Sequence, residues 1–267
     1  MKKRRIVKDG HIHSPYCPHG TSDKLKEYVD KALEMRLEEI SFTEHMPLPK
    51  GFVDEKIILE SSPTEEEFEK YLIELEEIKR SYEGKIKINI GTEVDYIDGL
   101  EKKTRALLYK YGIDIEDSIL SVHFIRIDEK YYCIDYSKET FKEIADILGG
   151  IEKLYDRYFE TLLKSIKADI GIFKPRRIGH STLVRRFNKE YPFEYKNEAL
   201  LEEIVKEMKE KNYEIDHNTS GLRKEYCEEE YPSGILMELI KKYNIPEVYG
   251  SDAHTAKDVG ASFNYKE

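Results

Sequence analysis

Three histidines lie within nine residues near the amino terminus, in the segment DGHIHSPYCPHG at positions 9–20. His11 and His13 are separated by one residue, so on an extended segment both imidazoles point to the same side of the chain. Imidazole binds metal ions and transfers protons near neutral pH. The same spacing recurs at Asp252 and His254. These pairs indicate metal binding rather than acid–base chemistry alone.

Short β-branched runs alternate along the chain with longer amphipathic patterns. The runs predict strands at 5–9, 39–43, 85–91, 118–122, 177–179, 213–217 and 247–250. Helical patterns follow at 25–35, 64–84, 197–212 and 234–244, and the second opens with a Thr64/Glu67 capping box. Between 137 and 168 we expect one helix to Leu148, a break at Gly149 and Gly150, and a second long helix.

Seven strands that alternate with helices predict parallel pairing through right-handed crossovers. The length of 267 residues suits one α/β domain over 1–267, which we expect to be a (β/α) barrel of reduced strand number. An open, doubly wound sheet is the alternative. No glycine-rich phosphate loop follows the first strand, which favours the barrel.

The histidines share one position relative to the predicted strands. Each lies at, or just past, a strand's carboxyl end, and the third strand ends instead at Glu93. In a parallel barrel these ends meet on one face, so we expect a common site there. A carboxylate such as Glu93 can bridge two ions. Mixed imidazole and carboxylate ligands suit Zn, Mn or Fe. Cys17, between Tyr16 and Pro18, is interpreted as a small buried hydrophobic residue.

The composition excludes several classes of partner. A formal net charge of −10 argues against general affinity for nucleic acid or for an anionic membrane. The three cysteines, Cys17, Cys133 and Cys227, form no C-x-x-C pair, which is typical of a reducing compartment. The basic start MKKRRIVKDG precedes no apolar run, and no stretch approaches the roughly 20 apolar residues of a membrane span. We therefore expect a cytoplasmic protein.

Several motifs, in order, resemble one known family. They are HIHSPYCPHG, FTEHMPLP, GTEVDYI, SVHFI, RIGHSTLVRRF, NTSGLRKEY and GSDAH, which together run from Asp9 to His254. This set resembles the PHP (polymerase and histidinol phosphatase) superfamily, specifically its histidinol-phosphate phosphatase branch. The resemblance implies a distorted seven-stranded (β/α) barrel and hydrolysis of L-histidinol phosphate to L-histidinol and phosphate. It also implies three divalent transition-metal ions.

The resemblance further assigns ligands to each ion. The first would be held by His11, His13, Glu93 and Asp252, and the second by Glu93, His123 and His180. The third would be held by His19, His45 and His254. A metal-bound hydroxide, held by Glu93, Asp252 and His123, would attack phosphorus in line. For His217 we expect packing or support of a ligand, and for Asp9 and Glu44 the orientation of neighbouring imidazoles.

The phosphate group needs its own positive contacts. Arg186 and Arg223 each follow a strand end by a few residues, and a guanidinium matches two phosphate oxygens. We expect Arg223 to be the stronger contact, with Asn218 and Lys224 beside it. Arg185 is an alternative to Arg186. Two other functions stay open: a phosphodiesterase or exonuclease with the same metals, and a metal-binding barrel without catalysis.

Overall fold

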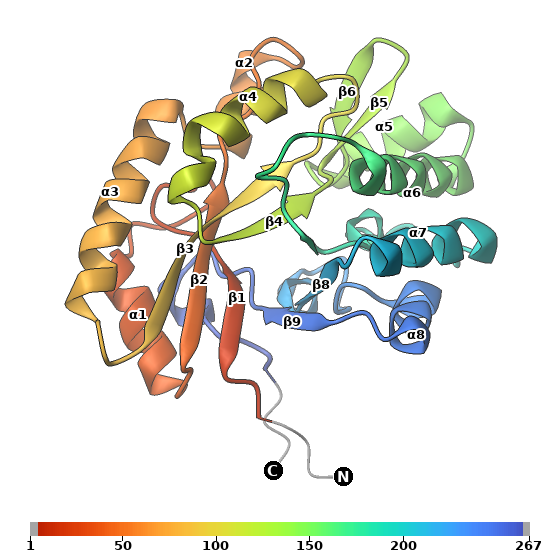
Figure 1. Ribbon diagram of the computed structural model, residues 1–267. Coiled ribbons are helices and arrows are strands. Elements are labelled where there is room, and N and C mark those ends of the chain that lie inside the picture. The colour runs from red at the N-terminus through yellow and green to blue at the C-terminus, as the bar shows by residue number, and fades with distance from the viewer. Residues whose placement is uncertain (1–4, 264–267) are drawn as a thin grey trace.

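Seven parallel strands form one sheet in the computed structural model, which describes residues 5–263 (Figure 1). Their order is β1-β2-β3-β4-β7-β8-β9. The strands are β1 (Lys8–Ile12), β2 (Glu39–His45), β3 (Lys87–Asp95), β4 (Asp117–Ser121), β7 (Arg177–Ile178), β8 (Glu214–Asn218) and β9 (Glu247–Gly250). Every neighbouring pair is parallel, so all seven carboxyl ends lie on one side.

The first and last strands of this order meet and nearly close the sheet into a barrel. Ile12 bridges to Ala253, and the amide of Asp252 donates to the His11 carbonyl at 2.7 Å. The buried carboxylate of Asp9 accepts the backbone amides of Ser251 and Gly260, each at 2.9 Å. The predicted barrel is confirmed and the open sheet is wrong. Asp9 bonds backbone at this seam and not an imidazole.

Close approach at the seam requires a glycine. A Cβ at Gly250 would lie 2.4 Å from Asp216 Oδ1 and 2.5 Å from His11 Cβ. Real Cβ atoms do not approach other atoms so closely, so a side chain here would push β9 away from β1 and β8. The end of β9 can therefore deliver Asp252 and His254 to the site.

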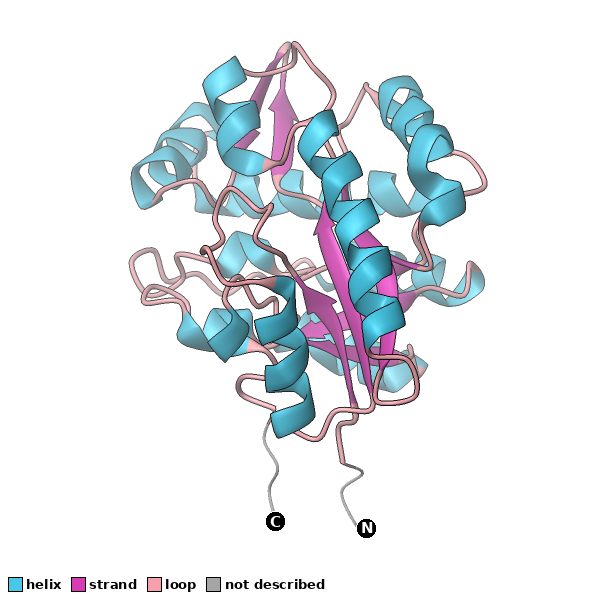
Figure 2. Ribbon diagram, turned by 90° about the vertical axis from the view of Figure 1, so that its left-hand side faces the viewer, coloured by secondary structure: helices cyan, strands magenta, loops and turns pink. Residues whose placement is uncertain are grey.

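Eight α-helices of the described chain pack outside the strands (Figures 1 and 2). They are α1 (Leu25–Glu34), α2 (Glu55–Ser61), α3 (Glu65–Ser81), α4 (Glu101–Tyr111), α5 (Lys138–Leu148), α6 (Ile151–Lys167), α7 (Glu198–Glu210) and α8 (Gly234–Tyr243). The predicted capping box starts α3, since Thr64 Oγ1 accepts the Glu67 amide and Glu67 Oε2 accepts the Thr64 amide. Within residues 5–263, none of the helices combines the length and the apolar character needed to cross a bilayer.

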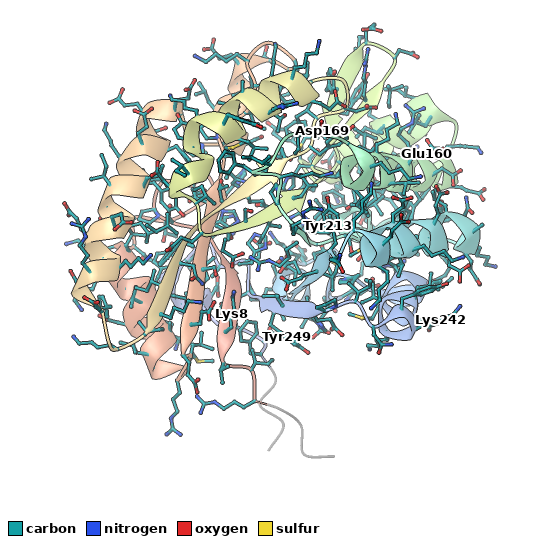
Figure 3. All side chains as sticks on the ribbon, in the orientation of Figure 1. Lys8, Glu160, Asp169, Tyr213, Lys242 and Tyr249 are labelled. Carbon is teal, nitrogen blue, oxygen red and sulfur yellow. The ribbon has the colours of Figure 1, made fainter. Side chains whose placement is uncertain are left out.

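The helices bury one face each and expose the other. Leu154, Tyr158 and Leu162 of α6 are fully buried in the larger apolar core. Glu160 of α6 and Lys242 of α8 project outward, with side chains 55% and 63% exposed (Figure 3). The high charge content of the sequence is therefore largely carried by the outer helix faces.

The strand ends differ from the prediction, and the structure adds two helices and one hairpin to it. β1 begins at Lys8 rather than at residue 5, and β3 continues to Asp95. The helices α2 and α4 were not predicted, nor was the antiparallel hairpin of β5 (Phe124–Ile127) and β6 (Lys130–Cys133). Asp128, in the turn of this hairpin, has φ +53°. Glycine or asparagine is more usual at such a position, so the sequence lacks the residue that would have predicted the turn.

Candidate metal centre

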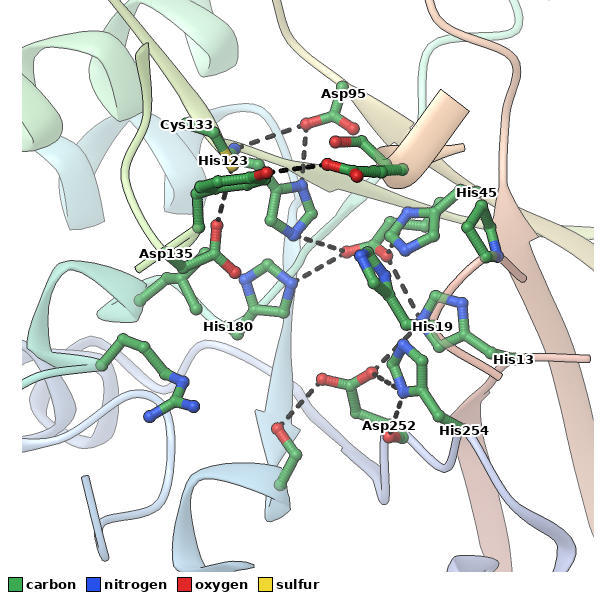
Figure 4. A pocket seen from close by; sticks show the side chains of 18 of the residues that line it. His13, His19, His45, Asp95, His123, Cys133, Asp135, His180, Asp252 and His254 are labelled. Carbon is green, nitrogen blue, oxygen red and sulfur yellow. Dashed lines mark hydrogen bonds and ion pairs between the residues drawn. The ribbon is translucent and has the colours of Figure 1, made fainter. Parts of the chain in front are cut away.

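Seven of the eight histidines gather at the carboxyl ends of the strands, and Figure 4 labels six of them. Six line a cavity of about 630 Å³, and His11 lies buried beside His13 with ring centroids 5.3 Å apart. The expected convergence therefore holds for these seven. His217 lies apart from the cavity, and its contacts are described below.

Glu93 stands at the centre of the imidazoles. Its Oε1 lies 2.8 Å from His180 Nε2 and 3.9 Å from His123 Nε2. Its Oε2 lies 3.5 Å from His13 Nε2 and 3.6 Å from His11 Nε2. The two oxygens thus face two different sets of imidazoles, which is the geometry of a carboxylate that bridges two ions. Burial raises the pKa of Glu93, but His11 and His45 hold it well below its usual range.

The first group joins His11, His13, Glu93 and Asp252. The ligand atoms of the first three lie within 4.8 Å of one another, and Asp252 Oδ1 is 3.1 Å from His13 Nε2 and 3.7 Å from His11 Nε2. Asp252 adopts φ +52°, a left-handed conformation that Asn and Asp tolerate better than most residues. Its other oxygen, Oδ2, accepts the Ser220 hydroxyl at 2.9 Å, so Oδ1 remains to face the imidazoles.

The donor atoms of this first group fit a cation. Among the described residues, His11 Nε2 and His13 Nε2 are buried without a hydrogen-bond partner. Such orphaned atoms are costly unless an ion or water binds them. Burial lowers the pKa of His11, but Asp216, Asp252 and Glu93 outweigh it and raise the pKa to about 10. The carboxylates therefore give the site a negative charge, which favours the binding of a cation. The imidazole and carboxylate donors suit a divalent metal ion.

The second and third groups flank the first. Ligand atoms of Glu93, His123 and His180 lie within 4.8 Å of one another. So do those of His13, Cys17, His45 and His254. Burial and the neighbouring His13 ring hold the pKa of His45 and His254 well below the usual value, which keeps both imidazoles neutral, as ligands must be.

In the third group, Cys17 takes the position that the resemblance assigns to His19. The His19 ring centroid lies 6.2 Å from that of His45 and 6.0 Å from that of His254, but His19 is in none of the groups whose ligand atoms lie within 4.8 Å of one another. Cys17 is buried as expected, but its thiol sits among imidazoles, 3.9 Å from His19 Nδ1. Its surroundings are therefore polar, unlike those of a hydrophobic packing residue.

Carboxylates behind the imidazoles fix which ring nitrogen faces the site. Asp216 Oδ2 lies 2.8 Å from His11 Nδ1, Asp95 Oδ1 lies 2.8 Å from His123 Nδ1, and Glu44 Oε1 lies 3.3 Å from His13 Nδ1. Each contact leaves the opposite nitrogen, Nε2, free for a ligand bond. Of these three, only Glu44 was predicted. Asp95 and Asp216 could have been found from strand alternation, since they share the face of Glu93 and Asn218, respectively.

His217 points to the opposite face of β8. Its Nδ1 lies 2.7 Å from Glu247 Oε2, its Nε2 lies 3.1 Å from Glu230 Oε2, and its ring stacks on Tyr249 at 4.3 Å. Burial lowers its pKa, but the two carboxylates outweigh it and raise the pKa to about 9. These contacts agree with the expected packing role.

The expected phosphate contacts divide into two sets. Arg186 and Lys224 line the cavity, and Arg186 Nη1 is buried without a hydrogen-bond partner among the described residues. Arg185 instead forms two 2.7 Å bonds with Glu229. It is therefore committed to that carboxylate, which removes it as an alternative to Arg186.

Arg223 and Asn218 do not reach the cavity. The Arg223 guanidinium donates to the Ser251 carbonyl at 2.6 Å and lies 3.9 Å from Asp258. Arg223 ends the short 3₁₀ turn Ser220–Arg223, and its bond to Ser251 ties it to the segment after β9. The Asn218 amide bonds Asp216 at 2.9 Å. Arg186 lines the cavity and Arg223 does not, so the structure favours Arg186 as the candidate phosphate contact, and the role of Arg223 stays a prediction.

Comparisons with known proteins agree with this architecture. The PHP domain model matches residues 9–220, and a PHP-associated model matches 236–264. Histidinol-phosphatase of Bacillus subtilis is 42% identical over 265 residues, covering 98% of this chain and 97% of that protein. The probable histidinol-phosphatase of Deinococcus radiodurans is 29% identical over 259 residues, 96% of this chain and 89% of its own.

Two solved structures share the fold. The provisionally assigned histidinol phosphatase of Listeria monocytogenes superposes with a TM-score of 0.90 at 37% identity, covering 96% of this chain and 98% of that one. Histidinol phosphate phosphatase of Lactococcus lactis, complexed with zinc, L-histidinol and phosphate, gives a TM-score of 0.70 at 22% identity, covering 95% and 88%. The barrel, the histidine cluster and these matches together assign this chain to the PHP domain family.

Proposed function

We propose that this protein is a metal-dependent phosphomonoesterase that hydrolyses L-histidinol phosphate to L-histidinol and phosphate. The observation that carries the proposal is the position of Glu93, whose two oxygens face separate imidazole groups at the base of a cavity. Full-length similarity to the B. subtilis histidinol-phosphatase supports the substrate. Phosphate bound in the cavity would contact both the metal centre and the cationic side chains of Arg186 and Lys224.

The proposal includes three divalent transition ions, chosen among Zn, Mn and Fe. His11, His13, Glu93 and Asp252 would hold the first, and Glu93, His123 and His180 the second. His45 and His254 would hold the third together with His19, which is the least closely grouped of these residues. When bound, divalent ions in such a cluster activate water as a nucleophile and neutralise the phosphate oxygens.

The chain's own groups supply binding and orientation. The Arg186 guanidinium, with its orphaned Nη1, would bind two phosphate oxygens, and Lys224 would act as a point charge. Asp216, Asp95 and Glu44 hold the imidazole tautomers. Glu93, Asp252 and His123 are the residues that we propose would hold the activated water.

The remaining parts of the proposal concern the whole chain. We assign residues 1–267 to a single PHP-type domain that acts on a small-molecule ester in the cytoplasm, with neither nucleic acid nor membrane as a partner. The net charge of −10 and the three free thiols support this. Long polyanions would be repelled, whereas one phosphate group could be held by the local positive charge that bound ions, Arg186 and Lys224 would supply.

A direct experiment combines metal analysis with a substrate panel. The purified protein should carry up to three transition ions per chain, and phosphate release should be fastest from L-histidinol phosphate. Faster cleavage of single-stranded DNA would favour a PHP-type exonuclease. Bound metal without turnover of any ester would favour the non-catalytic barrel. Either outcome would overturn the proposed activity.

A further inference from the structure

One carboxylate in the cavity, among the described residues, accepts only a single weak hydrogen bond. Five acidic residues line the cavity: Glu60, Glu93, Asp95, Asp135 and Asp252. Glu93 and Asp252 face the imidazoles that would hold metal. The other three are not in the metal groups described above. For each of them, a partner for the negative charge must be identified.

Two of these three already have partners. Asp95 Oδ1 is engaged with His123 Nδ1 at 2.8 Å, where it orients the ring. Glu60 accepts the Tyr136 hydroxyl at 2.7 Å and lies 3.6 Å from Lys56 Nζ near the surface. Both carboxylates therefore have contacts that explain their presence without a ligand.

Asp135 differs from both. Its side chain accepts one hydrogen bond, from the Cys133 thiol, with Sγ 3.3 Å from Oδ1. A thiol is a weak donor, and a carboxylate has about four acceptor positions. Within residues 5–263, no cationic side chain lies within ion-pair distance of it. Burial raises its pKa, but the more distant His123, His180 and Lys224 help to bring that pKa below its usual value. In Figure 4, Asp135 lies beside His180 at the wall of the cavity. Most of its hydrogen-bonding capacity thus stays available inside a partly buried site.

The backbone holds Asp135 in a fixed position relative to the metal cluster. The amide of Ile134 donates to the His123 carbonyl at 2.9 Å, and Cys133 pairs with Phe124 across the β5–β6 hairpin. Asp135 follows that hairpin directly. The two-stranded hairpin is separate from the seven-stranded sheet, so it adds a group to the cavity that the barrel itself does not supply.

We propose that the Asp135 carboxylate binds the ammonium group of the substrate and thereby selects amino-alkyl phosphates over alkyl phosphates that lack an amine. This inference rests on the proposed function. A phosphate at the metals, Arg186 and Lys224 places the rest of the ester in the same cavity as Asp135. An ammonium offers three donors to a carboxylate that lacks strong ones, and the pair forms where water is partly excluded.

A purely supporting role predicts a different pattern. Asp135 lies in the field of Lys224 and His123, so it could merely position these groups. Its loss would then slow the hydrolysis of every phosphate ester to a similar degree. Recognition of the ammonium predicts a loss only for substrates that carry one.

The test compares two substrates that differ in the amine alone: L-histidinol phosphate and 3-(imidazol-4-yl)propyl phosphate. We expect Asp135→Asn to lower kcat/KM for the first by about 10- to 100-fold, mainly through KM, because a charge-assisted contact is lost. For the second, kcat/KM should change by less than about twofold. The control is Asp146→Asn, which removes the same charge from an exposed position on α5. Equal losses on both substrates would overturn the proposal.

Equilibrium binding separates this inference from the proposed activity. Calorimetry with L-histidinol and with 3-(imidazol-4-yl)propanol needs no turnover, so it decides the role of Asp135 even if the wild type hydrolyses neither ester. Asp135→Asn should weaken binding of the amine alone, and Asp135→Glu should restore part of it. Metal content and the thermal unfolding midpoint of each variant verify folding. Unchanged binding of L-histidinol in a folded Asp135→Asn protein would refute the inference.

Discussion

Asp216 and His11 form a fully buried pair in which the carboxylate Oδ2 lies 2.8 Å from the imidazole Nδ1. The same carboxylate accepts the Asn218 amide at 2.9 Å, so it is itself held in place. The contact directs His11 Nε2 toward Glu93 and Asp252. Asp216 thus acts on the metal site through the orientation of a ligand rather than as a ligand.

Asp216→Asn tests this positioning role. The amide has the same shape but also offers a donor, so it permits the wrong His11 tautomer. We expect metal affinity at the first group to fall by about 10- to 100-fold, as found for partners of ligating histidines in general. Competition with a chelator measures this directly. Asp146→Asn is the matched control, and unchanged metal affinity in Asp216→Asn would show that the pair is dispensable.

The ligands themselves should show coupled losses. His11→Ala and Asp252→Asn each remove a donor from the same group, so each should lose bound metal and phosphatase activity together. Asparagine is preferable to alanine at position 252, because the φ of +52° would strain an alanine and confuse a ligand defect with a folding defect. Metal content by mass spectrometry and turnover should fall in parallel. Full occupancy with normal turnover in both variants would exclude the assignment.

Arg186 and Arg223 should differ in the opposite order to that expected from sequence. Arg186→Ala should lower kcat/KM by about 10- to 1000-fold with metal content unchanged, if the guanidinium contacts the phosphate in ground and transition states as proposed. Arg223→Ala should have a smaller kinetic effect and a lower thermal unfolding midpoint, since its bond to the Ser251 carbonyl ties the 3₁₀ turn to the segment after β9. A larger kinetic loss in Arg223→Ala would return the phosphate role to that residue.

The sequence was most informative where chemistry and strand periodicity coincide. His11 and His13 could be assigned to one face because side chains two residues apart point to the same side of an extended chain. Asp252 was placed with them by the family resemblance, since it lies past β9 with φ +52°. The same spacing rule places Asp216 and Asn218 on one face of β8 and His217 on the other. Arg223 could not be placed, because its position depends on a bond to the Ser251 carbonyl, which lies 28 residues further along the chain. Asp135 depends on a hairpin whose turn, at Asp128, lacks glycine.

His217 gives a pH-dependent contribution to stability whose sign follows from its carboxylate partners. Burial alone would lower its pKa, but Glu230 and Glu247 raise it to about 9, above the roughly 6.5 of an unfolded histidine. A raised pKa means that the folded state binds the proton more tightly. The stabilisation is therefore complete below about pH 6.5 and is lost as the pH rises through about 9.

His217→Phe removes the charge while keeping a ring that can stack on Tyr249. We expect the wild type to have a higher free energy of unfolding than this variant at pH 6. At pH 10 this advantage should be smaller by on the order of 2–3 kcal/mol. Denaturant titrations at both pH values measure the difference, and Tyr136→Phe, which breaks an exposed hydrogen bond to Glu60, controls for general effects of pH. Metal content should stay close to that of the wild type, because His217 faces away from the cavity. A stability difference that is constant from pH 6 to pH 10 would show that folding does not raise the pKa of His217. Loss of metal as complete as in His180→Ala would instead make His217 part of the metal centre.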